Sequence, residues 1–142
     1  MYKATRLIYE ALKQEDGFKV FTDETPNTTC VWLQFSVENG GSYRIRFINT
    51  DDDNDTAVRV FGLIHVNEDA RPRVLKACNA VKRKFRYVKF VLDDDGDVNV
   101  EYDFPVSGSN PATSAREMVI RFADIVDKAY PDLMRAIYDP TY

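Results

Sequence analysis

The sequence has very few of the residues from which catalytic sites are usually built. Its 142 residues include one histidine, His65, and two cysteines, Cys30 and Cys78. A catalytic base that works near neutral pH is most often a histidine, and no serine or cysteine stands beside His65 in the sequence. We interpret His65 as a partly buried strand residue. An enzyme assembled around His65 from distant residues stays the less favoured alternative, and we expect no enzymatic activity.

The cysteines and the apolar runs point to a simple intracellular protein. Neither Cys30 nor Cys78 belongs to a C-x-x-C pair, so the sequence predicts no zinc site and no redox motif. Cys78 falls in the apolar stripe of an expected helix, where a buried thiol acts as a small hydrophobe. No apolar run approaches the roughly 18 residues of a membrane helix, and the first residues lack a secretory pattern. We therefore expect a cytoplasmic protein with free thiols and no membrane partner.

Motifs that would hold a cofactor or a metal ion are also missing. The chain has neither G-x-x-x-x-G-K-[ST] nor G-x-G-x-x-G, which are the glycine-rich phosphate loops. The acidic run 51–55 matches the first ligand positions of an EF-hand, but the sixth position is Thr56 and the twelfth is Gly62. We interpret this run as a solvated loop and the run 93–97 as a turn, with a weakly held surface ion as the alternative. No cofactor and no metal site are expected.

What the sequence does contain is a strong hairpin signal. Residues 88–92 and 98–104 alternate between apolar and polar side chains, on either side of Asp93-Asp94-Asp95-Gly96-Asp97. An Asp-Gly step between two alternating runs is among the strongest short-range signals for a β-hairpin. The sequence therefore predicts two antiparallel strands joined at Gly96.

The remaining periodicities define the fold class. Further strands are expected at 18–21, 29–38, 43–47 and 56–66, and helices at 3–14, 70–85 and from about 110 onward. Pro131 is expected to break or kink the last helix, because proline lacks an amide donor. The order predicts one α+β domain over 1–142, with an antiparallel sheet of about five to six strands and three main helices.

A basic strip at 71–89 is the first candidate binding surface. No acidic residue lies between Asp69 and Asp93, and the basic residues of the expected helix include Arg73, Lys76 and Arg83. Such a strip suits an acidic protein or a nucleic-acid backbone. We favour a solvated helix face, because the whole chain has a net charge of −4 whereas nucleic-acid modules are usually basic.

The second face of the sheet is the other candidate surface. By alternation, Trp32, Phe61, Leu63 and Tyr87 are expected to point away from the main core. Aromatic side chains mixed with arginine are enriched in protein interfaces. The alternative is that the first helix covers this face, and the pattern favours neither reading.

The most distinctive segments resemble one family. Residues 75–85, with Asn79 at the centre and Phe85 at the end, followed by the hairpin at 89–98, resemble the YbjN family of bacterial domains. Residues 129–137 are similar to the closing segment of that family. The resemblance extends over roughly residues 56–138.

The resemblance implies a fold like that of the type III secretion chaperones, which have helices packed on an antiparallel sheet and are often dimeric. It also implies a non-enzymatic, chaperone-like or regulatory protein-binding domain of the bacterial cytosol, because the family is described as sensory regulators without an established catalytic site. A protein of unknown identity, or a second copy of the chain, would be the partner. The alternative function is a nucleic-acid-binding regulator that uses the strip 71–89.

Overall fold

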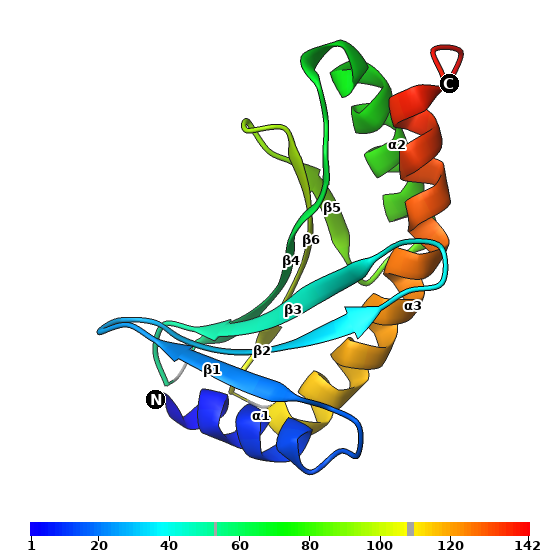
Figure 1. Cartoon of the computed structure of the whole chain (residues 1–142). Helices are drawn as coiled ribbons and strands as arrows, with labels where there is room; N and C mark the ends of the chain where they lie inside the picture. The colour runs from blue at the N-terminus through cyan, green and yellow to red at the C-terminus, as the bar shows by residue number, and fades with distance from the viewer. Residues whose placement is uncertain (53, 108–109) are drawn as a thin grey trace.

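Six strands form one antiparallel sheet in the order β1-β2-β3-β4-β6-β5 (Figure 1). The computed structural model of the chain describes residues 1–52, 54–107 and 110–142. The elements are α1 (Lys3–Lys13), β1 (Val20–Glu24), β2 (Thr29–Ser36), β3 (Ser42–Asn49), β4 (Asp55–His65), a short 3-10 helix (Glu68–Ala70), α2 (Arg71–Lys84), β5 (Lys89–Leu92), β6 (Asp97–Pro105) and α3 (Pro111–Tyr138). The predicted α+β class, with its antiparallel sheet and three main helices, is confirmed.

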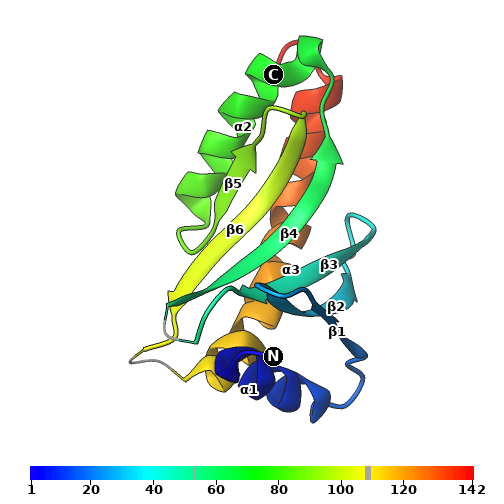
Figure 2. The ribbon, with the colours of Figure 1, turned by 90° about the vertical axis from the view of Figure 1, so that its left-hand side faces the viewer.

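The three helices cover one face of the sheet. α1 contacts β1, β2 and β3 at one end, α2 contacts β5 at the other end, and α3 contacts both α1 and α2. Figure 2 shows the opposite face of β4, β5 and β6 in front of α3. Within the described parts of the chain no helix lies over this side, which we call the open face. The alternative interpretation, in which the first helix covers the second face, is therefore wrong.

The last helix supplies much of the core. α3 begins at an N-cap, Asn110, whose side chain accepts a hydrogen bond from the Thr113 amide at 3.2 Å. Its apolar residues recur every three or four positions, as in an amphipathic helix. The fully or nearly fully buried ones are Ala115, Met118, Val119, Phe122, Ile125, Val126, Ala129, Leu133 and Ala136.

The expected break at Pro131 is absent, because α3 continues as one helix from Pro111 to Tyr138. Proline at position 131 cannot donate to the carbonyl of Asp127, four residues earlier. The turn between β2 and β3 supplies a substitute: Asn39 Nδ2 donates to the Asp127 carbonyl at 3.3 Å, and the Asn39 amide donates to the Asp127 carboxylate at 2.8 Å. A distant loop thus satisfies the group that the proline leaves without its helical donor.

The predicted hairpin at residues 93–97 is confirmed. β5 and β6 pair with Leu92 opposite Val98, and Gly96 has a φ of 88°, a conformation that favours glycine. The Asp93 carboxylate accepts hydrogen bonds from the amides of Asp95 and Asp97 and from Asn99 Nδ2. The acidic run 93–97 therefore forms the turn, as the sequence predicted.

One assignment within β4 is wrong. Leu63 was expected on the second face, but Leu63 and Ile64 are only 4% and 7% exposed and both belong to the core. The reason is a bulge: the ladder with β6 passes from Val60–Val100 directly to Ile64–Val98. Gly62 allows it with a φ of 63°, and its amide donates to Asn99 Oδ1 at 2.8 Å. A bulge shifts the alternation of side chains, so a period of two no longer applies.

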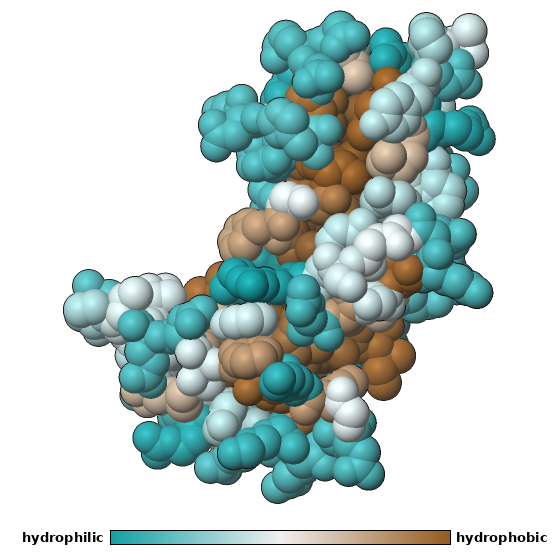
Figure 3. Space-filling model, viewed as in Figure 1, coloured by the Kyte–Doolittle hydropathy of each residue, from teal (hydrophilic) through white to brown (hydrophobic). Residues whose placement is uncertain are grey.

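The core comes close to the surface beside this bulge. β3 pairs with β4 through residues 57–59, and among the described residues no strand pairs with β4 on that side beyond Arg59. Figure 3 shows apolar side chains gathered in a hollow between β4 and the α2–α3 pair.

Candidate binding surface

One row of side chains crosses all six strands on the open face. Directly opposite residues of neighbouring strands share a face, and the strand registers connect the row step by step. In sheet order it consists of Phe21, Trp32, Arg46, Arg59, Glu101 and Lys89. The row is aromatic at the β1 edge and charged from β3 to β5.

The aromatic end is a stacked cluster. The Phe21 and Trp32 rings lie 4.4 Å apart with an interplanar angle of 20°. The Arg44 guanidinium lies 4.2 Å from the centre of the Trp32 ring on the same face, a favourable cation–π distance. Trp32 is half-buried by these neighbours, and its indole Nε1 has no hydrogen-bond partner among the described residues. The expected position of Trp32 on the second face is confirmed.

The arginines in the charged part of the row form ion pairs with neighbouring acidic residues. Arg46 lies 3.7 Å from the Asp23 carboxylate. Arg59 contacts the Asp103 carboxylate at 2.6 Å and that of Glu101 at 3.9 Å. Cross-strand arginines would repel each other, but here each has its own acid. The middle of the open face is therefore a fixed, largely neutralised network.

Phe61 is a large apolar side chain that is more exposed than Phe21 of the same face. It follows buried Val60, and it is 53% exposed. Exposed aromatic residues beside arginines are typical of protein interfaces. Phe61 thus lies where the sequence predicted it, unlike Leu63.

Tyr87 lies elsewhere than expected. It belongs to the loop between α2 and β5, and the Arg121 guanidinium of α3 lies 4.1 Å from the centre of its ring. Tyr87 is 49% exposed, but it stands at the sheet edge on the side of α3 rather than on the open face. The alternation pattern failed because Tyr87 precedes the first residue of β5.

Some side chains of the basic strip 71–89 make contacts within the protein itself. Arg73 donates to the carbonyls of Ala136 and Ile137 at 2.9 and 3.0 Å, near the end of α3. Lys76 lies 5.6 Å from the centre of the Tyr142 ring, whereas Arg83 is exposed to solvent. The sequence could not reveal the role of Arg73, because its partners lie more than sixty residues away.

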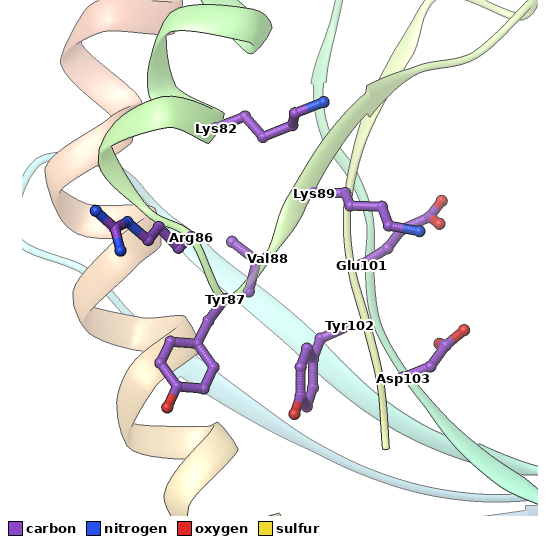
Figure 4. A pocket seen from close by; sticks show the side chains of 8 residues that line it. All are labelled: Lys82, Arg86, Tyr87, Val88, Lys89, Glu101, Tyr102 and Asp103. Atoms are coloured by element: carbon purple, nitrogen blue, oxygen red, sulfur yellow. The ribbon is translucent and has the colours of Figure 1, made fainter. Parts of the chain in front are cut away.

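A pocket of about 530 Å³ lies at the start of β5 (Figure 4). It is lined by Lys82, Arg86, Tyr87, Val88, Lys89, Glu101, Tyr102 and Asp103. Its volume lies within the range of sites that hold a small ligand or a short chain segment, roughly 300–1,000 Å³. The sequence pattern did not predict this pocket, because alternation does not reveal that β5 begins only at Lys89 while its hairpin partner β6 continues to Pro105.

The residues with catalytic or metal-binding chemistry do not assemble into a site within the described residues. His65 is exposed rather than partly buried as expected, and its Nδ1 lies 3.1 Å from an oxygen of Asp97. The described residues contain no group of three or more histidine, cysteine or acidic side chains placed to hold a metal ion. Asp53, a ligand position in the EF-hand alignment, lies outside the described residues.

Both cysteines are free and buried. Burial raises the pKa of the Cys78 thiol to about 11, so this thiol stays protonated at neutral pH. Burial also raises the pKa of the Cys30 thiol, against a smaller lowering effect of Arg46 beside it. Neither side chain has the lowered pKa that a reactive thiol requires.

Fold and surface together define an α+β protein whose helices cover one sheet face and leave the other open. In the described part of the chain, no helix combines the length and the apolar character that crossing a bilayer requires. The chain belongs to the YbjN family: the model of this family, described as "Putative bacterial sensory transduction regulator", matches residues 26–135. The resemblance seen in the sequence is thereby confirmed. No curated protein matches the chain.

Proposed function

We propose that the protein is a non-enzymatic regulator of the bacterial cytosol that acts by binding another protein on its open face. The observation that carries this proposal is the exposure of Phe61 on the open face of the sheet. The aromatic–arginine cluster around Trp32 lies on the same face. The family description, which names a regulator, supports the same function.

The surface chemistry favours a protein partner over a nucleic acid. Phosphate binding needs cations that are available to replace counterions. On the open face Arg46 and Arg59 already have acidic partners, and the whole chain has a net charge of −4. A mixed aromatic and paired-charge surface is instead typical of a protein interface.

A matched pair of variants tests this proposal. Phe61 and Ile120 are both exposed apolar residues, but Phe61 is on β4 and Ile120 is on α3. Partners captured from the native bacterium by each protein would be purified, and their affinities measured. We expect Phe61→Ala to weaken binding about tenfold or more, as truncation of an interface aromatic costs above about 1.4 kcal/mol. Ile120→Ala should bind as the wild type does.

The result that would overturn the proposal is equal binding by Phe61→Ala and wild type, with Arg44→Ala also unchanged. If the captured partner is a second copy of the chain, the same variants should shift the monomer–dimer equilibrium in sedimentation experiments. Circular dichroism of each variant separates lost binding from lost folding.

A further inference from the structure

The edge of the sheet beside the pocket is incomplete. β5 begins at Lys89, opposite Glu101, whereas β6 continues beyond Glu101 to Pro105. Residues 102–104 of β6 therefore have β4 on one side and, among the described residues, no paired strand on the other. A strand edge without a neighbour is a template on which another extended chain can pair.

The cations around this edge are not matched by acids. Within the described residues no carboxylate lies within 4 Å of the charged groups of Lys82, Arg86 or Lys89. The two acids of the pocket, Glu101 and Asp103, face Arg59 instead. The charge available to an incoming segment is therefore positive.

Two tyrosines form the apolar wall of the same pocket. The Tyr87 and Tyr102 rings lie 6.1 Å apart, and Figure 4 shows them side by side with their hydroxyl groups pointing the same way. The Arg121 guanidinium makes a cation–π contact with the Tyr87 ring. Tyr102 lies opposite buried Val58 and so shares the helix side with Lys82 of α2, whereas Lys89 lies opposite Glu101 on the open face. Because successive residues of an added strand alternate between faces, its side chains on the helix side would meet the tyrosines and Lys82, and those on the other side would meet Lys89.

We propose that this pocket binds an extended acidic peptide segment of a partner, which adds a strand to the sheet beside residues 102–104 of β6. The inference rests on the proposed function, because it gives the chemistry of a partner protein. It concerns a surface separate from Phe61. Main-chain hydrogen bonds to β6 would hold the segment, and Lys82, Arg86 and Lys89 would select its acidic residues.

Synthetic peptides test the proposal directly. The probe is a fluorescein-labelled eight-residue peptide of alternating glutamate and valine, with binding followed by fluorescence anisotropy. A peptide of alternating lysine and valine controls for charge, and a glutamate–valine peptide with methylated backbone amides controls for main-chain pairing. We expect the first peptide to bind, the lysine peptide not to bind, and methylation to weaken binding at least tenfold.

Charge-reversal variants of the protein, with a matched control pair, provide a second test. Lys82→Glu with Lys89→Glu should weaken binding of the glutamate peptide at least tenfold. Arg6→Glu with Lys13→Glu makes the same change in net charge on exposed residues of α1, and should leave the affinity within about twofold. The amide resonances of Tyr102, Asp103 and Phe104 should shift when the peptide binds.

Three results would overturn the proposal. The first is no binding at about 1 mM peptide, the affinity range of very weak complexes. The second is equal binding of the methylated and ordinary peptides. The third is that an oligothymidylate binds more tightly than the glutamate peptide and loses its affinity to the same extent in the Lys82→Glu, Lys89→Glu variant. That result would mean that the pocket binds polyanions in general.

The same measurements keep the two proposals apart. Phe61→Ala should bind the peptide as the wild type does, since Phe61 does not line the pocket. Peptide binding together with partner capture that is indifferent to Phe61 and Arg44 would refute only the open-face proposal. Partner capture that depends on Phe61, with no peptide binding, would refute only the pocket proposal.

Discussion

At the scale of single residues, Asp93 is the clearest case in which local sequence determines structure. The Asp97 amide lowers the pKa of its carboxyl below the usual range, with further hydrogen bonds from Asn99 and Asp95 and the charge of Arg71. Since the folded pKa lies below the unfolded value of about 3.9, the ionised carboxylate stabilises the fold above that value. This stabilisation is lost as pH falls through the folded pKa.

We therefore predict that Asp93→Asn lowers the free energy of unfolding at pH 7 and flattens its decrease in acid. An asparagine amide cannot accept from Asn99 in the way that the second carboxylate oxygen does. Urea unfolding at pH 7 and near pH 3 measures both effects. Asp94→Asn in the same turn is the control and should match the wild type at pH 7; equal stability of both variants would contradict the prediction.

The turn was predictable because the hydrogen bonds to the Asp93 carboxylate join residues within six positions of it. The contacts of Arg73 and Tyr87 could not be predicted in this way, because their partners come from α3. The sequence identifies residues of the right chemistry, but long-range packing decides which of them stay available to a partner.

At the scale of elements, the contact between the β2–β3 turn and α3 explains why one long helix spans Pro131. The Asn39 side chain donates to the carbonyl that Pro131 leaves without a helical donor. We predict that Asn39→Ala lowers stability by about 0.5–1.5 kcal/mol, the net value of a typical hydrogen bond.

A double-mutant cycle tests this account. Pro131→Ala restores an amide donor for the Asp127 carbonyl, so Asn39→Ala should cost less in that background than in the wild type. Thermal or urea unfolding of the four proteins gives the coupling. Equal costs in both backgrounds would show that Asn39 stabilises the turn for another reason.

Periodicity predicted the helices and strands themselves but failed where an element departs from its ideal repeat. The bulge at Gly62 moves Leu63 into the core, and an isolated glycine inside a strand is the one signal that could have indicated it. Continuity through Pro131 had no local signal, because it depends on Asn39, ninety-two positions away from the proline.

At the scale of the whole molecule, α3 connects the two ends of the sheet. It contacts α1 at one end and α2 at the other, and the buried apolar residues of both ends form one core cluster. The sheet alone cannot couple its ends strongly, since β3 and β4 share only three paired positions. This arrangement predicts that damage to the α2 end weakens the α1 end equally.

Leu133→Ala tests that coupling. Leu133 is fully buried in α3, close to Asp132, which pairs with Lys84 of α2. Its truncation should cost about 2–5 kcal/mol. Trp32, the single tryptophan, reports on β2 near α1, and far-UV circular dichroism reports on the helices. Both transitions should move to lower denaturant together, as in two-state unfolding. A Trp32 transition that stays at its wild-type midpoint would mean that the two ends unfold separately, and that the aromatic cluster around Trp32 and the β6 pocket belong to independent units.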